Sequence, residues 1–165
     1  MKKSIFAALA ALFLIASTAH AAEGLNVGVD VGTHSAKSAS IGYNFTPAIG
    51  AEVSYTRFGD YTGYKIGGYS AHDSLVNVSL VGTKPLIENL DLVGKIGRAN
   101  VITVAKTPGA GGTTLTSQVW TYSIGVVYHV VGGLGVRAAI DGMTGSGIDG
   151  GNVKNYETVG LTYAF

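Results

Sequence analysis

The final strand-like segment of the chain constrains its fold more than any other feature. From residue 157 to residue 165, large and mostly apolar side chains alternate with small or polar ones. The larger set comprises Glu157, Val159, Leu161, Tyr163 and Phe165. In the closing strand of a transmembrane β-barrel one face meets lipid and the other faces the lumen. This pattern therefore predicts an all-β chain that crosses a membrane with strands.

The beginning of the chain has the three parts of a secretory signal peptide. Lys2 and Lys3 precede an apolar run from Ile5 to Ala16, and Ala19-His20-Ala21 supplies a small-residue cleavage site. The apolar run has 12 residues, too few to cross a bilayer as a helix. We expect a cleaved signal peptide over 1–21 and a barrel domain over 22–165, exported to the outer membrane of a Gram-negative bacterium.

Composition narrows the classes of function. Without Lys2 and Lys3 the basic residues fall from 11 to 9 against 10 acidic ones, so nucleic acid is not an expected partner. Cysteine is absent, which excludes disulfides and thiolate chemistry. The 25 glycines suit a narrow barrel, and the nine tyrosines suit membrane interfaces.

Eight segments follow the strand period of two. They are 25–31, a segment that ends at Phe45, one that begins at Ala51, 74–82, 90 to about 104, 120–129, 134–140 and 157–165. Short connections at 46–50, 84–89 and 130–133 alternate with longer ones at 59–72, 105–117 and 142–153. This alternation predicts an eight-stranded antiparallel up-and-down transmembrane β-barrel with short periplasmic turns and longer outer loops.

Three short motifs resemble the outer-membrane protein A transmembrane barrel family. They are Gly50-Ala51-Glu52-Val53-Ser54-Tyr55, then Pro85-Leu86-Ile87-Glu88-Asn89-Leu90-Asp91-Leu92 leading to Lys95-Ile96-Gly97, and Gly160-Leu161-Thr162-Tyr163-Ala164-Phe165. The resemblance covers most of the chain after the signal peptide. Family members continue into a peptidoglycan-binding domain, which we do not expect here.

The resemblance implies a charge network inside the barrel. The matching positions are Glu52, Lys95 and Arg137, and each also lies on the strand face opposite the apolar one. Lys or Arg facing lipid would cost roughly 2–4 kcal/mol, so these charges should point inward. Val127 stands where family members carry a further acid, which predicts a smaller network. Arg98 would share the lipid-facing side of its strand with Ile96 if alternation held. We therefore expect a bulge near Gly97 or an interface position for Arg98.

Two functions fit this network. The three charges are structural counter-charges in an interior that is only just wide enough for its own side chains, or they line a narrow porin-like solute pore. A less favoured alternative is a barrel enzyme that modifies lipid A, with His72, Asp73 and Ser74, or His34 and Ser35, at the outer rim. Neighbours on a strand point to opposite faces, so Asp73 cannot orient His72. We therefore expect no catalytic residues.

Aromatic side chains at both ends of the strands predict two interfacial girdles. These residues are Tyr43, Phe45, Trp120, Tyr122 and Tyr128. By resemblance, Tyr163 and Phe165 form a C-terminal signal read by the barrel-assembly machinery. The expected partners are outer-membrane lipid and lipopolysaccharide, that machinery, periplasmic chaperones and a surface ligand of the outer loops. No spacing of His, Asp or Glu predicts a metal, and no motif predicts a cofactor.

These observations predict a structural or surface-interaction protein of the outer membrane. Its role would be membrane integrity or adhesion, and its lumen would be filled by side chains.

Overall fold

In the computed structural model, residues 23–63, 69–106, 112–144 and 154–165 are described, and all structural statements below concern them. The strands are β1 (Gly24–Gly32), β2 (Lys37–Thr46), β3 (Ile49–Arg57), β4 (Tyr61–Gly63), β5 (Tyr69–Ile87), β6 (Leu90–Lys106), β7 (Thr113–Val131), β8 (Leu134–Met143) and β9 (Asn155–Ala164). A short 3-10 turn, η1 (Thr33–Ser35), joins β1 to β2. The expected signal peptide, 1–21, lies outside the described residues and stays a prediction.

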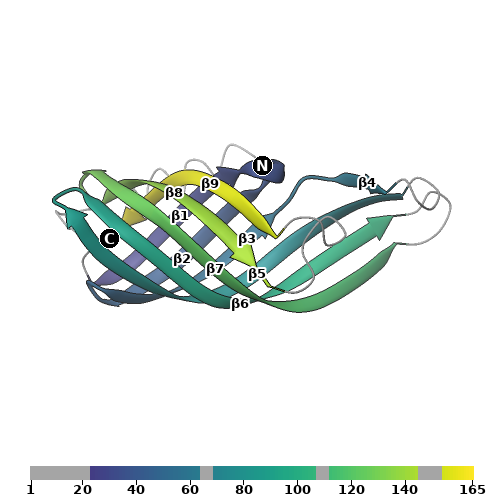
Figure 1. Ribbon diagram of the computed structural model, residues 1–165, viewed down its shortest axis with the longest axis horizontal. Helices are drawn as coiled ribbons and strands as arrows, with labels where there is room; N and C mark the ends of the chain where they lie inside the picture. The colour runs from purple at the N-terminus through teal and green to yellow at the C-terminus, as the bar shows by residue number, and fades with distance from the viewer. Residues whose placement is uncertain (1–22, 64–68, 107–111, 145–153) are drawn as a thin grey trace.

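The strands form a closed antiparallel barrel (Figure 1). Sequential neighbours pair around the circle, β1 pairs with β9, and β3 pairs with β5 to close it. The short β4 pairs only with the outermost part of β5, beyond the last residue of β3, so it adds no separate position to the circle. The barrel therefore has eight strand positions, and the predicted fold is confirmed.

Three two-residue turns join strands at one end of the barrel, here called the turn end. They are 47–48, 88–89 and 132–133. Gly132 and Gly133 have positive φ angles of 54° and 82°, which glycine adopts without strain in a tight hairpin. At the first turn, the backbone N–H groups of Ala48 and Ile49 donate to the Thr46 hydroxyl at 3.3 and 3.0 Å. The predicted short connections are therefore tight hairpins.

The opposite end, here called the loop end, is uneven. Strands β5, β6 and β7 continue well beyond the rest of the barrel (Figure 1). Their pairing extends to Ser70 with Lys106 and to Ala105 with Thr113, whereas β8 pairs with β7 only as far as Thr121. Large parts of the connections predicted at 59–72 and 105–117 are therefore strand. That prediction was wrong because Thr, Ser and Gly were taken as loop residues, while neighbouring strands supply a continuous hydrogen-bonded ladder.

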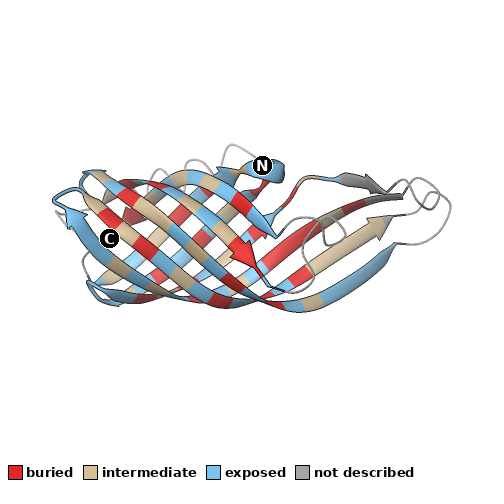
Figure 2. Cartoon of the chain, in the orientation of Figure 1, coloured by how far each residue is buried: buried red, intermediate tan, exposed pale blue. Residues whose placement is uncertain are grey.

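Burial alternates along the strands (Figure 2). Large apolar side chains cover the exterior: Ile41 is 51% exposed, Val78 58% and Ile124 59%. An exterior this apolar is suited to lipid contact. Among the described residues, no helix is long and apolar enough to cross a membrane.

A path drawn through cross-strand partners climbs toward the loop end as it circles the barrel. It runs through Leu25, Tyr43, Ala51, Leu80, Ile96, Tyr122, Gly142 and Asn155. Continuing the β1–β9 register places Asn155 opposite position 35, so one circuit climbs about ten residues. Each step to the next strand therefore climbs roughly 1.25 residues, which fixes the relative heights of side chains on different strands.

Candidate functional site

Four charged side chains meet in the middle of the lumen. Lys95 Nζ on β6 donates to Glu52 Oε1 on β3 at 2.6 Å, and the Arg137 guanidinium on β8 donates to Glu52 Oε2 at 3.2 Å. Arg137 Nε also donates to Asp30 Oδ1 on β1 at 3.1 Å, and its terminal nitrogen donates to the other oxygen of Asp30. The structure thus brings together the three predicted residues and adds Asp30. We call these four residues the charge cluster.

The charge cluster is buried and its formal charges balance. Asp30 and Glu52 are each 6% exposed and Arg137 is 9% exposed. A buried charge is costly unless it is paired and hydrogen-bonded, and here each cation has a carboxylate partner. The smaller network expected from Val127 is not found, because Asp30 supplies a second carboxylate. Val127 itself is buried in the lumen as an apolar residue.

Gly160 makes room for one of these ion pairs. On β9 it stands directly between Asp30 on β1 and Arg137 on β8. A Cβ at this position would overlap the backbone oxygen of Val29 and a carboxylate oxygen of Asp30. The absence of a side chain lets Arg137 reach across β9 to Asp30.

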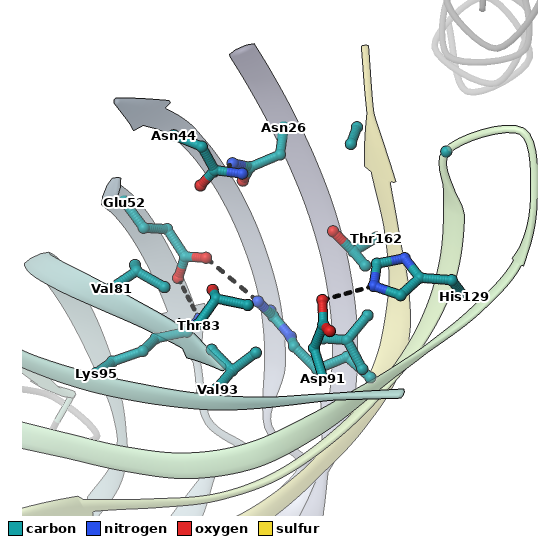
Figure 3. A pocket seen from close by; sticks show the side chains of 14 residues that line it. Asn26, Asn44, Glu52, Val81, Thr83, Asp91, Val93, Lys95, His129 and Thr162 are labelled. Atoms are coloured by element: carbon teal, nitrogen blue, oxygen red, sulfur yellow. Dashed lines mark hydrogen bonds and ion pairs between the residues drawn. The ribbon is translucent and has the colours of Figure 1, made fainter. Parts of the chain in front are cut away.

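A cavity of about 80 Å³ lies on the turn-end side of the charge cluster. Figure 3 shows Asp91 and His129 facing each other across it, with His129 Nε2 2.8 Å from Asp91 Oδ2. The Asn26 amide donates to the Asn44 side-chain oxygen at 3.3 Å on the same side of the lumen. Glu52, Lys95 and Arg137 also line this cavity, so the charge cluster forms its inner limit.

On the loop-end side, a smaller cavity of about 30 Å³ is lined by the same charges together with Thr56, Asp141 and Tyr156. Beyond it lies a group of buried apolar side chains. We call this apolar group the outer plug; its residues are Ala36, Phe58, Leu75, Ala99, Val101, Val119, Met143 and Tyr156. The rings of Phe58 and Tyr156 meet edge to face, with centroids 5.0 Å apart. Two different barriers, one charged and one apolar, therefore lie in series along the lumen.

The sequence analysis missed Asp30 and the outer plug. Asp30 shares the inward face of its strand with Asn26 and Gly28, so alternation alone could have identified it. Tyr156 lies one residue before the predicted final strand, and Phe58 lies just after β3, which made both resemble loop residues.

The residues considered for catalysis are not arranged as a triad. His72 Nδ1 lies 3.8 Å from Asp60 Oδ1, and Ser74 accepts a hydrogen bond from the Tyr55 hydroxyl at 3.1 Å. Asp73 is buried and accepts a hydrogen bond from Thr103. His34 and Ser35 lie in η1, both with positive φ angles. Among the described residues, no group of three or more His, Asp and Glu side chains is placed to hold a metal ion.

The aromatic residues predicted for the girdles are all exposed on the barrel. Their exposed fractions are 51% for Tyr43, 55% for Phe45, 56% for Trp120, 48% for Tyr122 and 50% for Tyr128. Tyr163 differs, since it is 4% exposed and its ring packs edge to face against Phe165 at 4.9 Å. Tyr163 is therefore buried although it lies on the outward face of its strand.

Arg98 faces outward without a bulge. The pairing of β6 with β5 and β7 is continuous through Gly97 and Arg98, so the expected irregularity near Gly97 was wrong. The guanidinium of Arg98 donates to Gln118 Oε1 at 2.8 Å, and its central carbon lies 5.6 Å from the centroid of the Trp120 ring. Its neighbour is thus a predicted girdle residue, and the alternative, that Arg98 occupies an interface position, stays a prediction.

Comparison with solved structures identifies similar barrels. The N-terminal β-barrel domain of Pseudomonas aeruginosa OprF matches with a TM-score of 0.63 and 15% identity over 86% of this chain and 95% of that chain. Neisserial surface protein A also has a TM-score of 0.63 and 15% identity, over 86% of this chain and 94% of its own. Ail, the attachment invasion locus protein of Yersinia pestis, has a TM-score of 0.55 and 16% identity over 87% and 99%.

No protein-family model matches the chain, and no curated protein matches its sequence. The structural matches show the fold, and they agree with the resemblance found in the sequence. The chain has the fold of the small eight-stranded β-barrels of bacterial outer membranes.

Proposed function

We propose that this protein is a structural barrel of the bacterial outer membrane whose lumen is closed. It acts through its exterior and its loop end, in membrane integrity or adhesion. The observation that carries the proposal is the charge cluster, in which Asp30, Glu52, Lys95 and Arg137 join four separate strands across the lumen.

Two further observations support a closed lumen. An eight-stranded barrel has an interior just wide enough for side chains. The outer plug then adds apolar side chains on the loop-end side of the charges, and a hydrophobic constriction hinders the passage of water and ions.

A gel-shift assay combined with planar-bilayer recording tests this proposal. The full chain, refolded in detergent, should migrate faster before heating than after heating, as a folded barrel does. The same sample should pass no resolvable current in a planar bilayer. Steady conductance in the unmodified protein would overturn the closed lumen, and a missing gel shift would overturn the membrane barrel.

A narrow solute pore is the second candidate, and one observation favours it. The cavities on both sides of the charge cluster are both lined by Glu52, Lys95 and Arg137, so these side chains lie between them. If the pore is the function, Lys95→Ala should change a conductance that the unmodified protein already has. If the lumen is closed, the Lys95→Ala variant should pass no resolvable current, because its outer plug is intact.

We propose no catalytic role. The His72 side chain faces Asp60, and both groups lie at the loop end of the barrel. Expression of the protein should therefore leave the mass of lipid A unchanged. A mass change that disappears in His72→Ala would contradict this.

The assembly role of Tyr163 and Phe165 also remains a proposal. The edge-to-face contact between their rings orders the C-terminal residue against the barrel. We expect Phe165→Ala to lower the amount of protein inserted in the outer membrane, measured by the heat-dependent gel shift of membrane fractions. Unchanged insertion would contradict the role.

A further inference from the structure

Three basic side chains lie on the exterior of the barrel near the loop end. Lys37 begins β2, Arg57 ends β3, and Arg98 lies in β6. All three are exposed and share the outward strand face with apolar residues such as Ile41, Val53 and Ile96. We call them the exterior basic group.

Lys37 and Arg57 are held directly opposite each other by the register of β2 and β3. Like charges that face each other across a strand pair destabilise the sheet. Arg57 has one carboxylate nearby, Asp60 at 3.8 Å, but the two side chains are 55% and 69% exposed and such pairs are weak. No ion pair involves Lys37 within the ranges that the structure covers. The pair therefore leaves a local excess of positive charge.

Arg98 is oriented but not neutralised. Its hydrogen bond to Gln118 and its position beside Trp120 both involve uncharged partners. A guanidinium has five N–H donors, and the contact with Gln118 uses one nitrogen. Across the portion of the chain that is described, Arg98 forms no ion pair. It is thus a fixed cation with donors left for an anion.

The register places the exterior basic group at one height. The cross-strand path from Lys37 reaches Arg57, then Ser74, then Ile102 on β6. Three steps climb about four residues, so the β6 residue level with Lys37 is Arg98. Arg57 lies about one residue higher. The group therefore forms part of a ring around the barrel.

Aromatic residues share this height. Tyr55 on β3 is the cross-strand partner of Ala39 on β2, which places Tyr55 just below the level of Lys37. Trp120 on β7 is the direct cross-strand partner of Arg98. Below the ring the exterior is apolar, with Val78 58% and Ile96 60% exposed. This arrangement is that of the boundary between the hydrocarbon and the headgroups, where aromatic side chains collect.

We propose that the exterior basic group binds the phosphates of a membrane lipid headgroup, namely the diphosphorylated headgroup of lipopolysaccharide in the outer leaflet. Arginine matches phosphate with paired donors, and a charge-assisted hydrogen bond is stronger than a neutral one. Strands β3 and β6 are two steps apart, about 10 Å, so Arg98 and the Lys37–Arg57 pair are placed to hold two separate phosphates of one headgroup.

The position favours a lipid over free phosphate. When the phosphate of a lipid is held at this height, the acyl chains of that lipid lie beside the exposed apolar side chains below. One lipid molecule therefore gains both the polar and the apolar contacts. Binding also offsets the repulsion between Lys37 and Arg57. The proposal rests on the membrane-spanning role proposed above, which the heat-dependent gel shift tests separately in every variant.

Binding of fluorescent diphosphoryl lipid A to the full chain, refolded in non-ionic detergent, tests the proposal. The variants are Arg98→Gln and the double variant Lys37→Gln/Arg57→Gln. The matched control is Lys84→Gln, which removes an exposed cation from β5 near the turn end. All variants are first required to show the heat-dependent gel shift, so that a loss of binding is not a loss of fold.

We expect each exterior variant to weaken lipid A binding roughly tenfold while the control binds as the unmodified protein does. Dephosphorylated lipid A should bind the unmodified protein as weakly as diphosphoryl lipid A binds the variants. Equal binding by all variants would overturn the proposal, as would an equal loss in Lys84→Gln, which would indicate general charge attraction. Displacement of lipid A by inorganic phosphate at equal phosphate concentration would show a free-phosphate site and overturn the lipid assignment.

Discussion

Two arginines show that a charged side chain has different partners inside and outside this barrel. Arg137 is 9% exposed and donates to two carboxylates in the lumen. Arg98 faces outward, where its partners are the Gln118 amide oxygen and the Trp120 ring. The charges of the charge cluster are balanced within the chain, whereas the exterior basic group leaves positive charge available to another molecule. Charge inside the barrel therefore serves stability, and the charge outside it is what we propose for contact with the membrane.

Arg137→Ala should give the largest effect. It leaves Asp30 and Glu52 buried with one cation instead of two, and removing one partner of a buried ion pair costs about 3–5 kcal/mol. Urea titration of the protein folded in lipid vesicles measures this loss. The matched change Arg98→Ala should cost less than about 1 kcal/mol, because its partners are exposed. Equal losses would break the comparison between inside and outside.

Phe58→Ala should give the next largest loss, about 3 kcal/mol, because it leaves a cavity in the outer plug and removes the contact with the Tyr156 ring. The same urea titration measures it. Phe45→Ala is the control, since Phe45 is 55% exposed on the exterior. If Phe45→Ala were the more damaging change, the outer plug would not be a packed core.

Gly160→Ala should destabilise the folded barrel by about 1–3 kcal/mol, because the new methyl group overlaps Asp30 and the β1 backbone. Gly94→Ala is the control, since no atom lies within 4 Å of a Cβ built there. Urea midpoints of the two variants compare them directly. An unchanged urea midpoint in Gly160→Ala would show that Arg137 can reach Asp30 even when residue 160 carries a side chain.

Lys37→Gln should have the smallest effect on stability. The sign of that effect tests whether exterior charge, unlike interior charge, lacks a partner within the chain. In detergent without lipopolysaccharide, the change removes repulsion from Arg57 and should stabilise the barrel by about 0.5 kcal/mol or leave it unchanged. In vesicles that contain lipopolysaccharide, the gain should disappear. A loss of more than about 1 kcal/mol in detergent would mean that Lys37 has a stabilising role within the chain itself.

Alternation along the strands predicted most of the barrel because each strand has one face on the apolar exterior and the other in the lumen. The same reasoning placed Glu52, Lys95 and Arg137 on the inward face, and the structure brings them into contact. Alternation cannot predict which residue on another strand an inward-facing side chain contacts. Asp30 and Arg137 are 107 residues apart, and only the barrel register brings Gly160 between them.

Strand ends were harder to predict than strand cores. Beyond the proposed lipid boundary an exposed strand face no longer needs apolar residues. The outer parts of β5 and β7 accordingly contain several Ser and Thr residues and lose the apolar alternation. Burial also departs from alternation locally, as at Tyr163, which is 4% exposed on the outward strand face. Neither effect can be read from the period of hydrophobic residues.

The uneven height of the strands decides what a soluble macromolecule meets first. From Arg98 to Lys106 the β6 strand continues for about 26 Å, with β5 and β7 hydrogen-bonded on either side. The η1 turn, in contrast, lies close to the height of Lys37. Three of the eight strand positions thus project at the loop end as a hydrogen-bonded sheet, while the described residues on the opposite side of the barrel end lower. If the loop end faces the cell exterior, as the proposed function requires, an antibody, phage or host receptor approaching from outside would meet this projecting sheet before the other described residues.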